Sequence, residues 1–297
     1  MREEATAKKL KAVRFGASNP RHIVVVSDIH CGCQMGLMPP DGATIEGGGL
    51  VTPSSFQKYI YDIWRYFWDK WVPDITEGEP YDVVINGECI DGVHHKSTTQ
   101  WSQNLSDQTA AAVRLLRPIV ERCKGRVFLI RGTEAHSGKS GCEDERCGRE
   151  LAKYGNIAKT KDGFYSRYDL WKNLGGGLVH FTHHIGATGS AAYESTAPHK
   201  EITEAFIEAG RWDQRPPDVV VRSHRHRHII DLMATTRGNA FAVVTPGWQG
   251  KTPFTHKIAG GRSTQPQFGG IVLTWATKEK LIYERHYVRR LERDEPE

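Results

Sequence analysis

The sequence predicts an α/β fold, because short β-branched runs alternate along the chain with longer segments whose apolar residues recur at helical spacing. Five of the strand-like runs stop at a cluster of His, Asp or Glu. Ligands collect at the carboxyl ends of strands in open α/β sheets, so we expect these clusters to meet in one site. With 297 residues the chain is long enough for one large domain, which we predict for residues 21–297, after an N-terminal arm at residues 1–20.

The strands are predicted from runs of strand length that are rich in β-branched or aromatic residues. The first run (HIVVVS) leads directly into Asp28 and His30, and a later one (DVVVR) leads into His224 and His226. In chain order the predicted strands are His22–Ser27, Tyr81–Ile85, Arg126–Ile130, Tyr165–Leu170, Leu178–Thr182, Asp218–Arg222, Phe241–Thr245, Ile271–Ala276 and Leu281–Val288.

Three helices are predicted between these strands. The first covers Phe56–Val72, with Ser54 or Ser55 as its N-cap. Its large apolar side chains share one face, so we expect them to pack in the core rather than to stack on bases or a partner. The other two helices cover Ser106–Arg122 and Ala197–Ala209.

A Gly- and Pro-rich stretch without any period occupies residues 31–54, between the first strand and the first helix. Loops of this length are uncommon as simple connectors in compact domains and are usually functional when they occur. We therefore predict that this segment is a functional loop inserted into the domain.

Composition and charge restrict the class of protein. The hydrophobic (38%) and charged (25%) fractions suit a folded globule, and neither an apolar run of about 18 residues nor a signal-peptide pattern is present. We therefore expect a cytoplasmic protein without a membrane partner, whose six cysteines are reduced thiols. The net charge of +5 is compatible with an anionic substrate but does not demand nucleic acid.

The clusters at the strand ends hold the residue types that bind divalent metals. Neutral imidazoles combined with carboxylates suit Zn, Mn, Fe, Ni or Co, whereas sites made only of oxygen ligands suit Mg or Ca. A set of this size that includes a central carboxylate allows two ions, bridged by that carboxylate and by a hydroxide. The first candidates are Asp28, His30, Glu88, His183, His224 and His226.

In this order the motifs resemble the calcineurin-like metallophosphoesterase family, over about residues 22–228. The resemblance rests on Asp28-Ile29-His30, on Gly87 to Asp91, on Gly132 to His136, on His183 and on His224-Arg225-His226. It implies a four-layer α/β/β/α sandwich of mixed sheets. The stretch TPGWQGKTPF (Thr245–Phe254) and the loop at 31–54 also look like phage and prophage relatives, which would place the protein in the cytoplasm of a phage-infected or prophage-bearing bacterial host.

The resemblance also implies an arrangement of ligands. Asp28, His30 and His226 would hold the first metal, and His183 and His224 the second. Glu88 would bridge the two ions. The family normally has Asp at the bridging position, so the longer arm of Glu88 changes its reach and puts the separation of the metals in question.

A second departure from the family lies at Gly132 to His136, where the family has Gly-Asn-His followed by an acid. One hypothesis is that Glu134 is a ligand of the second metal and that His136 supplies the proton to the leaving oxygen. The alternative is that Thr133 takes the ligand position and Glu134 the position of the acid.

Residues beside these motifs are expected to complete the site. Arg131 and Arg225 could bind phosphate, because a guanidinium makes bidentate hydrogen bonds to it, and His184 would face the substrate. Asp91 and His94 are expected to support the ligands from behind, since ligating imidazoles need a partner for their other nitrogen.

The predicted reaction is hydrolysis of a phosphate ester by metal-activated hydroxide, with two divalent ions as cofactors. Diesters are favoured, because their poor leaving group needs a proton and His136 is a candidate donor. The substrate class then includes nucleotides and nucleic acids. The alternatives are a phosphomonoesterase and a catalytically impaired module that binds metal or nucleic acid; the sequence names neither the metals nor the oligomeric state.

Overall fold

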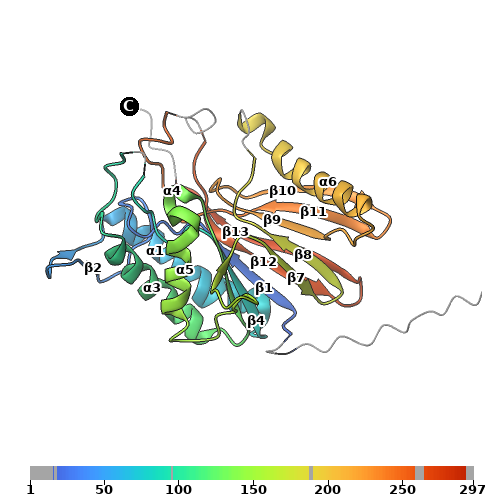
Figure 1. Ribbon diagram of the computed structural model, residues 1–297, viewed down its shortest axis with the longest axis horizontal. Coiled ribbons are helices and arrows are strands. Elements are labelled where there is room, and N and C mark those ends of the chain that lie inside the picture. Colours follow the sequence, from blue (N-terminus) through green and yellow to red (C-terminus); the bar gives the residue numbers. More distant parts are fainter. Residues whose placement is uncertain (1–15, 17–18, 95, 187–189, 258–263, 292–297) are drawn as a thin grey trace, which may run out of the picture.

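The computed structural model describes residues 16, 19–94, 96–186, 190–257 and 264–291. The predicted arm at residues 1–20 therefore lies almost entirely outside the described residues. Within the described part, two mixed sheets and several helices make up an α/β fold, which confirms the predicted class (Figure 1). No helix of the described ranges is both long enough and apolar enough to cross a bilayer.

The first sheet has six strands, and the parallel strands in it carry the first candidate ligands. Its order is β13 (Leu281–Arg289), β12 (Phe268–Ala276), β1 (His22–Val26), β4 (Tyr81–Asn86), β5 (Val127–Ile130) and β6 (Ser166–Arg167). β1, β4, β5 and β6 run parallel, whereas β12 is antiparallel to both β1 and β13. The carboxyl ends of the parallel strands therefore meet at one edge of the sheet.

The second sheet has five strands in the order β10 (Ile229–Thr235), β11 (Gly238–Val244), β9 (Val219–Arg222), β8 (Gly177–Phe181) and β7 (Leu170–Leu174). Its three central strands are parallel, and a hairpin closes each side. The two sheets share one apolar core, in which Val25 and Ile271 of the first sheet cluster with Val179 and Phe241 of the second. The ends of β8 and β9 thereby come close to the ends of β1 and β4.

Helices cover the outer faces of the two sheets (Figure 1). Among the described residues, three helical segments cover the six-stranded sheet. The first is α1 (Ser55–Tyr66), which continues through a π-helical turn (η1, Phe67–Trp71) into α2 (Val72–Thr76). The other two are α3 (Leu105–Arg122) and α5 (Cys142–Leu151). On the five-stranded sheet, α6 (Thr196–Arg211) packs its buried Ile202 against Val220 of β9 and Ala242 of β11. Short turns form α4 (Glu134–Ser137), η2 (Lys139–Gly141) and η3 (Ala191–Tyr193).

The first helix begins where the sequence predicts. The backbone N–H of Gln57 donates to Ser54 Oγ at 3.2 Å, and the N–H of Ser54 donates to Gln57 Oε1 at 3.1 Å, which makes a reciprocal capping box. Its aromatic face is core, as predicted: Trp64, Phe67 and Trp68 are buried. Since these rings are enclosed, they do not present a stacking surface for bases.

Other predicted elements need correction. The single strand expected at Tyr165–Leu170 is two strands, β6 and β7, which belong to different sheets. The loop at residues 31–54 contains a small hairpin of β2 (Ala43–Thr44) and β3 (Leu50–Val51). It also buries Leu37 and Met38 completely, so part of this segment belongs to the core.

Candidate metal centre

The candidate ligands lie on the loops that directly follow four strands. Asp28 and His30 follow β1, Glu88 follows β4, His183 follows β8, and the remaining pair, His224 and His226, follows β9. Two of these strands belong to each sheet. The predicted convergence at the strand ends is therefore present, and the site lies where the two sheets meet.

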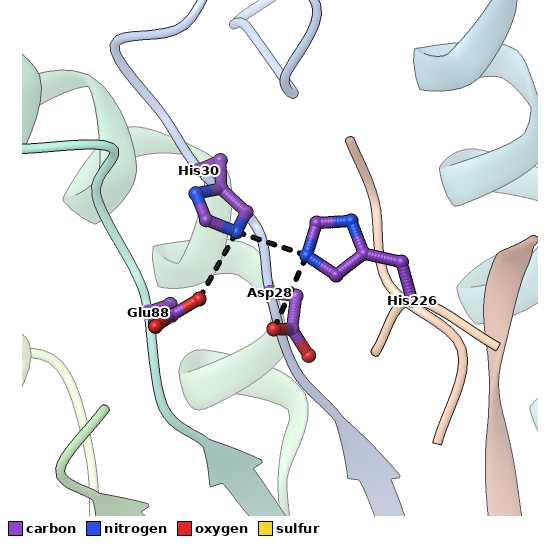
Figure 2. Close-up of side chains that lie close together, drawn as sticks. All are labelled: Asp28, His30, Glu88 and His226. Carbon is purple, nitrogen blue, oxygen red and sulfur yellow. Dashed lines mark hydrogen bonds and ion pairs between the residues drawn. The ribbon is translucent and has the colours of Figure 1, made fainter. Parts of the chain in front are cut away.

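A first group of four side chains points inward to one place (Figure 2). The Nε2 atom of His30 lies 3.1 Å from Glu88 Oε2 and 3.1 Å from His226 Nε2, and the latter lies 3.4 Å from Asp28 Oδ1. Tetrahedral sites with bonds of about 2.0–2.1 Å separate neighbouring ligand atoms by about 3.3 Å. The spacing in this group therefore suits a single small divalent cation.

A second group shares Glu88 with the first. Glu88 Oε1 lies 3.2 Å from His183 Nε2 and 3.8 Å from His224 Nδ1. The ring of His183 is fixed by its Nδ1–H, which donates to the carbonyl oxygen of Asn86 at 2.6 Å, so Nε2 is the nitrogen left to face Glu88. Each oxygen of the Glu88 carboxylate thus faces a different group.

Unsatisfied atoms in the site indicate that a cation fits there. Within the described residues, Asp28 Oδ1, His183 Nε2 and His224 Nδ1 are buried atoms that make no hydrogen bond, although each lies at ion-pair distance from another residue of the site. Buried polar atoms are nearly always satisfied, so three orphans at one place need an explanation. All three can act as metal ligands once the imidazoles have lost their extra protons, and divalent cations of the zinc and manganese class would then satisfy them together.

The backbone also holds these ligands in an unusual conformation. Non-glycine residues rarely adopt positive φ angles, and each such residue costs on the order of 1 kcal/mol or more. Five candidate ligands do so, with φ values of 54° (Asp28), 48° (His30), 59° (Glu88), 72° (His224) and 50° (His226). The first two loops are tied together where the backbone N–H groups of Asp28 and His30 donate to the carbonyls of Gly87 and Glu88, both at 3.1 Å.

Three glycines leave the space that the ligands occupy. A Cβ atom on Gly87 would lie 2.4 Å from His183 Nδ1, and one on Gly132 would lie 2.4 Å from Glu88 Cγ. On Gly247 it would lie 2.9 Å from the ring of His226. The motif glycines therefore have a packing role, since any side chain there would displace a ligand.

Charge in the site is balanced between buried imidazoles and carboxylates. Burial disfavours the charged form of His30, but its bonds to Asp91 and Glu88 outweigh this and raise its pKa to about 10. For His183, burial is likewise outweighed by Glu88 and Asp28, and the pKa rises to about 9. The pKa of Glu88 stays well below its usual value despite burial, chiefly because of His183. Without metal, protons on these imidazoles thus neutralise the carboxylates.

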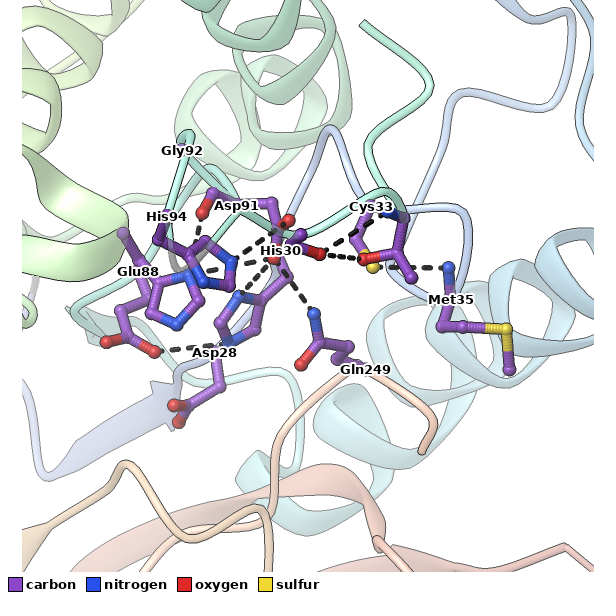
Figure 3. Close-up of polar contacts among 12 residues, drawn as sticks. Asp28, His30, Cys33, Met35, Glu88, Asp91, Gly92, His94 and Gln249 are labelled. Carbon is purple, nitrogen blue, oxygen red and sulfur yellow. Dashed lines mark hydrogen bonds and ion pairs between the residues drawn. The ribbon is translucent and has the colours of Figure 1, made fainter. Parts of the chain in front are cut away.

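Asp91 supports the first group from behind (Figure 3). Its Oδ1 lies 3.1 Å from His30 Nδ1, and it accepts further bonds from Gln249 (3.0 Å) and, at Oδ2, from Gln100 (2.6 Å). His94 Nε2 lies 3.5 Å from Asp91 Oδ2. Asp91 and His94 therefore lie beside the first group, as expected. Gln100 carries no motif that would reveal it, and Gln249 lies in the TPGWQGKTPF stretch, for which the sequence predicted no role in the site.

His136 lines the cleft beside His30, with the two ring centroids 4.4 Å apart. Its Nδ1–H donates to the carbonyl oxygen of Asp91 at 2.6 Å, so Nε2 is the nitrogen that carries no proton in the neutral ring. Burial lowers the pKa of His136 to about 4, so the imidazole is neutral at pH 7. A neutral ring in this tautomer accepts a proton at Nε2 and does not donate one, which does not support the predicted role as proton donor.

The Gly132 motif is arranged differently from the first hypothesis. Thr133 donates to Glu88 Oε1 from its hydroxyl at 2.5 Å and from its backbone N–H at 3.2 Å. Glu134 is the first residue of α4 and is exposed, and it is absent from the cation-binding groups of the described residues. The structure therefore brings Thr133, not Glu134, to the site.

The cleft above the two groups has a volume of about 380 Å³. His184, Arg225, Arg227 and Lys251 contribute to its lining, so the structure brings both His184 and Arg225 to the cleft. Arg131 does not line it: the guanidinium donates to Ser166 Oγ at 2.9 Å and to the carbonyl of Ser140 at 3.1 Å. The structure therefore does not bring Arg131 to the cleft, because its donors are bonded to Ser166 of β6 and to Ser140 of η2.

No protein-family model and no curated protein matches the chain. Solved structures do match, among them the solution NMR structure of the Thermotoga maritima protein TM1076. The similarity covers 91% of this chain and 99% of that one, at 10% identity and a TM-score of 0.33. A score of this size does not establish a common fold.

Proposed function

We propose that the chain is a phosphoesterase of the calcineurin-like type that uses two divalent cations. The observation that carries the proposal is the position of Glu88, whose Oε2 faces His30 while its Oε1 faces His183. The proposal includes the four-layer α/β/β/α sandwich of that family. It is supported by the core shared between the two sheets and by helices on both outer faces.

In this proposal Asp28, His30 and His226 would hold the first cation, His183 and His224 would hold the second, and Glu88 would be shared between them. Two divalent cations would orient a phosphoryl group, offset its negative charge and lower the pKa of a water molecule. The donor set of imidazoles and carboxylates suits Mn, Zn, Fe, Ni or Co. Thr133 contributes by holding the Glu88 carboxylate with two hydrogen bonds.

Other residues of the cleft would bind the phosphate and a water molecule. Arg225, Arg227 and Lys251 line the cleft and bring positive charge near a bound phosphate, and Arg227 also pairs with Glu194 at 2.8 Å. His136 Nε2 accepts a hydrogen bond and orients a water molecule in the cleft. We favour diesters, because a diester carries a single negative charge and the described cationic side chains of the cleft are few.

We expect the full-length chain to hydrolyse bis(p-nitrophenyl) phosphate when Mn²⁺ is added to metal-free protein. Asp28→Asn should lower kcat/KM by about 10³-fold or more, which is about 4 kcal/mol of transition-state stabilisation. The matched control is Asp231→Asn, which changes an aspartate that is paired with His199 away from the cleft and should keep full activity. The measurement is the initial rate with each of the five metals, on diester and monoester substrates.

Inactivity with every metal and both ester types, in protein that binds the metals, would contradict hydrolysis. It would favour the alternative of a catalytically impaired binding module. Faster turnover of the monoester would instead keep the reaction and overturn the preference for diesters.

A further inference from the structure

A separate group of cation-binding residues lies outside the cleft. It consists of His228, Glu284 and His286. The Nε2 atom of His228 lies 3.0 Å from Glu284 Oε1, and His286 Nδ1 lies 3.3 Å from Glu284 Oε2. None of the three residues lines the cleft above Glu88.

The group joins the two sheets. His228 ends the loop after β9 and directly precedes β10 of the five-stranded sheet. Glu284 and His286 are two residues apart on β13 of the other sheet, so their side chains leave the same face of the strand. Ile282 lies on that face as well and belongs to the core between the sheets, which shows that the face is turned toward the second sheet.

The charge of Glu284 requires a counter-charge. Its side chain is only 4% exposed, and the ion pairs that it makes within the described residues are both to imidazoles. An isolated buried carboxylate is strongly unfavourable. The rings of His228 and His286 lie 4.0 Å apart at 32°, so both stand at the same carboxylate. A divalent cation bound among the three side chains would neutralise the carboxylate and use one lone pair of each ring.

The geometry of the group suits that cation. The two imidazoles contact different oxygens of Glu284, at 3.0 and 3.3 Å, and one ligand atom from each of the three residues lies within 4.8 Å of the other two, which is close enough for one ion. Gln267 fixes His228 from behind, since its Oε1 accepts the backbone N–H of His228 at 2.5 Å. The side chain of His286 is half exposed, which leaves an approach from solvent for the ion and for a water ligand.

We propose that His228, Glu284 and His286 form a mononuclear site for a zinc-class divalent cation that pins β13 to the loop between β9 and β10. Two nitrogens and one carboxylate oxygen are the donor set that borderline divalent cations prefer. The role is structural: the ion links the edge strand of one sheet to the other sheet. It does not depend on whether the Glu88 centre is catalytic.

The test counts the zinc retained by the full-length chain. Metal-free protein is loaded with Zn²⁺, dialysed and analysed by mass spectrometry, and His286→Ala should retain about one equivalent less than the wild type. The Zn²⁺-induced rise in Tm should also be smaller in this variant. His199→Ala is the matched control, because it removes an exposed imidazole that bonds to Asp231 at 2.9 Å without a third ligand.

A second variant distinguishes the loss of a metal ligand from a disturbance of the fold by the substitution. His286→Asp keeps a ligand of the right kind and should restore the lost equivalent, whereas in a cluster held only by hydrogen bonds it would place two carboxylates together and lower the Tm. Equal zinc content in the wild type, His286→Ala and His199→Ala would overturn the proposal. Because the comparison is a difference between variants, it holds whatever the Glu88 centre binds.

Discussion

Glu88→Gln is expected to lower kcat for a phosphodiester by about 10³-fold or more and to reduce the number of tightly bound Mn²⁺ ions. The change keeps the size of the side chain and its bond from Thr133 Oγ but removes the negative charge that two cations would share. A neutral amide also has only one oxygen, whereas Glu88 presents one oxygen to the group around His30 and the other to the group around His183. Metal equivalents and kcat on one preparation measure both effects.

The matched control for this change is Glu134→Gln, an exposed acid on the neighbouring turn. It should keep its metals and its rate, because the structure does not bring Glu134 to either group. If Glu134→Gln lost one bound metal while Glu88→Gln kept its full metal content, Glu134 rather than Glu88 would be assigned as a ligand. This result would restore the hypothesis that Glu134 is the second-metal ligand.

Metal-free protein is expected to lose stability as the pH rises from about 6.5 toward 10. The pKa values of His30 and His183 are raised from 6.5 to about 10 and about 9, so their contribution is complete below pH 6.5 and is lost as the pH passes through 9 and 10. Asp28 and Glu88 have lowered pKa values, so their contribution is present above their ordinary values of 3.8 and 4.5 and is lost in acid. The loss in alkali should be on the order of several kcal/mol.

Urea unfolding in the presence of a chelator, at steps between pH 5 and pH 10, measures this dependence. Loading with Mn²⁺ should reverse the trend, because metals displace the protons of the imidazoles and therefore bind more tightly as the pH rises. His183→Gln should remove the part of the loss near pH 9, and His199→Gln should leave the curve unchanged. A metal-free stability that is flat from pH 6.5 to pH 10 would contradict the charge balance described for the site.

The grouping of the candidate ligands was largely predictable because these residues follow strands directly. Asp28 and His30 come after a β-branched run, and so do His224 and His226, so the strand signal and the cluster signal reinforce each other. The convergence of these loops then follows from parallel pairing of their strands. How the chain turns at the Gly132 motif was not predictable, since it is decided by where α4 begins.

Residues that reach the site from unrelated segments could not be predicted. Gln100 and Gln249 bond to the same carboxylate, Asp91, but they are 149 positions apart and neither belongs to a periodic pattern. His286 was similarly hidden, because its neighbour His228 lies in the loop that leads into the other sheet. Only the packing of one sheet on the other brings such residues together.

Helix α5 was not predicted from the sequence, for a different reason. Its first turn holds three acids, Glu143, Asp144 and Glu145, a composition that suits a helix N-terminus but adds nothing to an apolar stripe. Asp144 is nonetheless fully buried, because it accepts bonds from the backbone N–H groups of Cys89 and Gly132. Tertiary hydrogen bonds thus stabilise a helix that hydrophobic periodicity alone does not reveal.

Anomalous scattering from crystals of the full-length chain grown with Mn²⁺ tests the dinuclear centre most directly. Two peaks are expected about 3.5–4 Å apart, with Glu88 between them. One peak should lie against Asp28, His30 and His226, and the other against His183 and His224. A single peak in this centre, or two peaks with the Glu88 carboxylate turned away from one of them, would contradict the account.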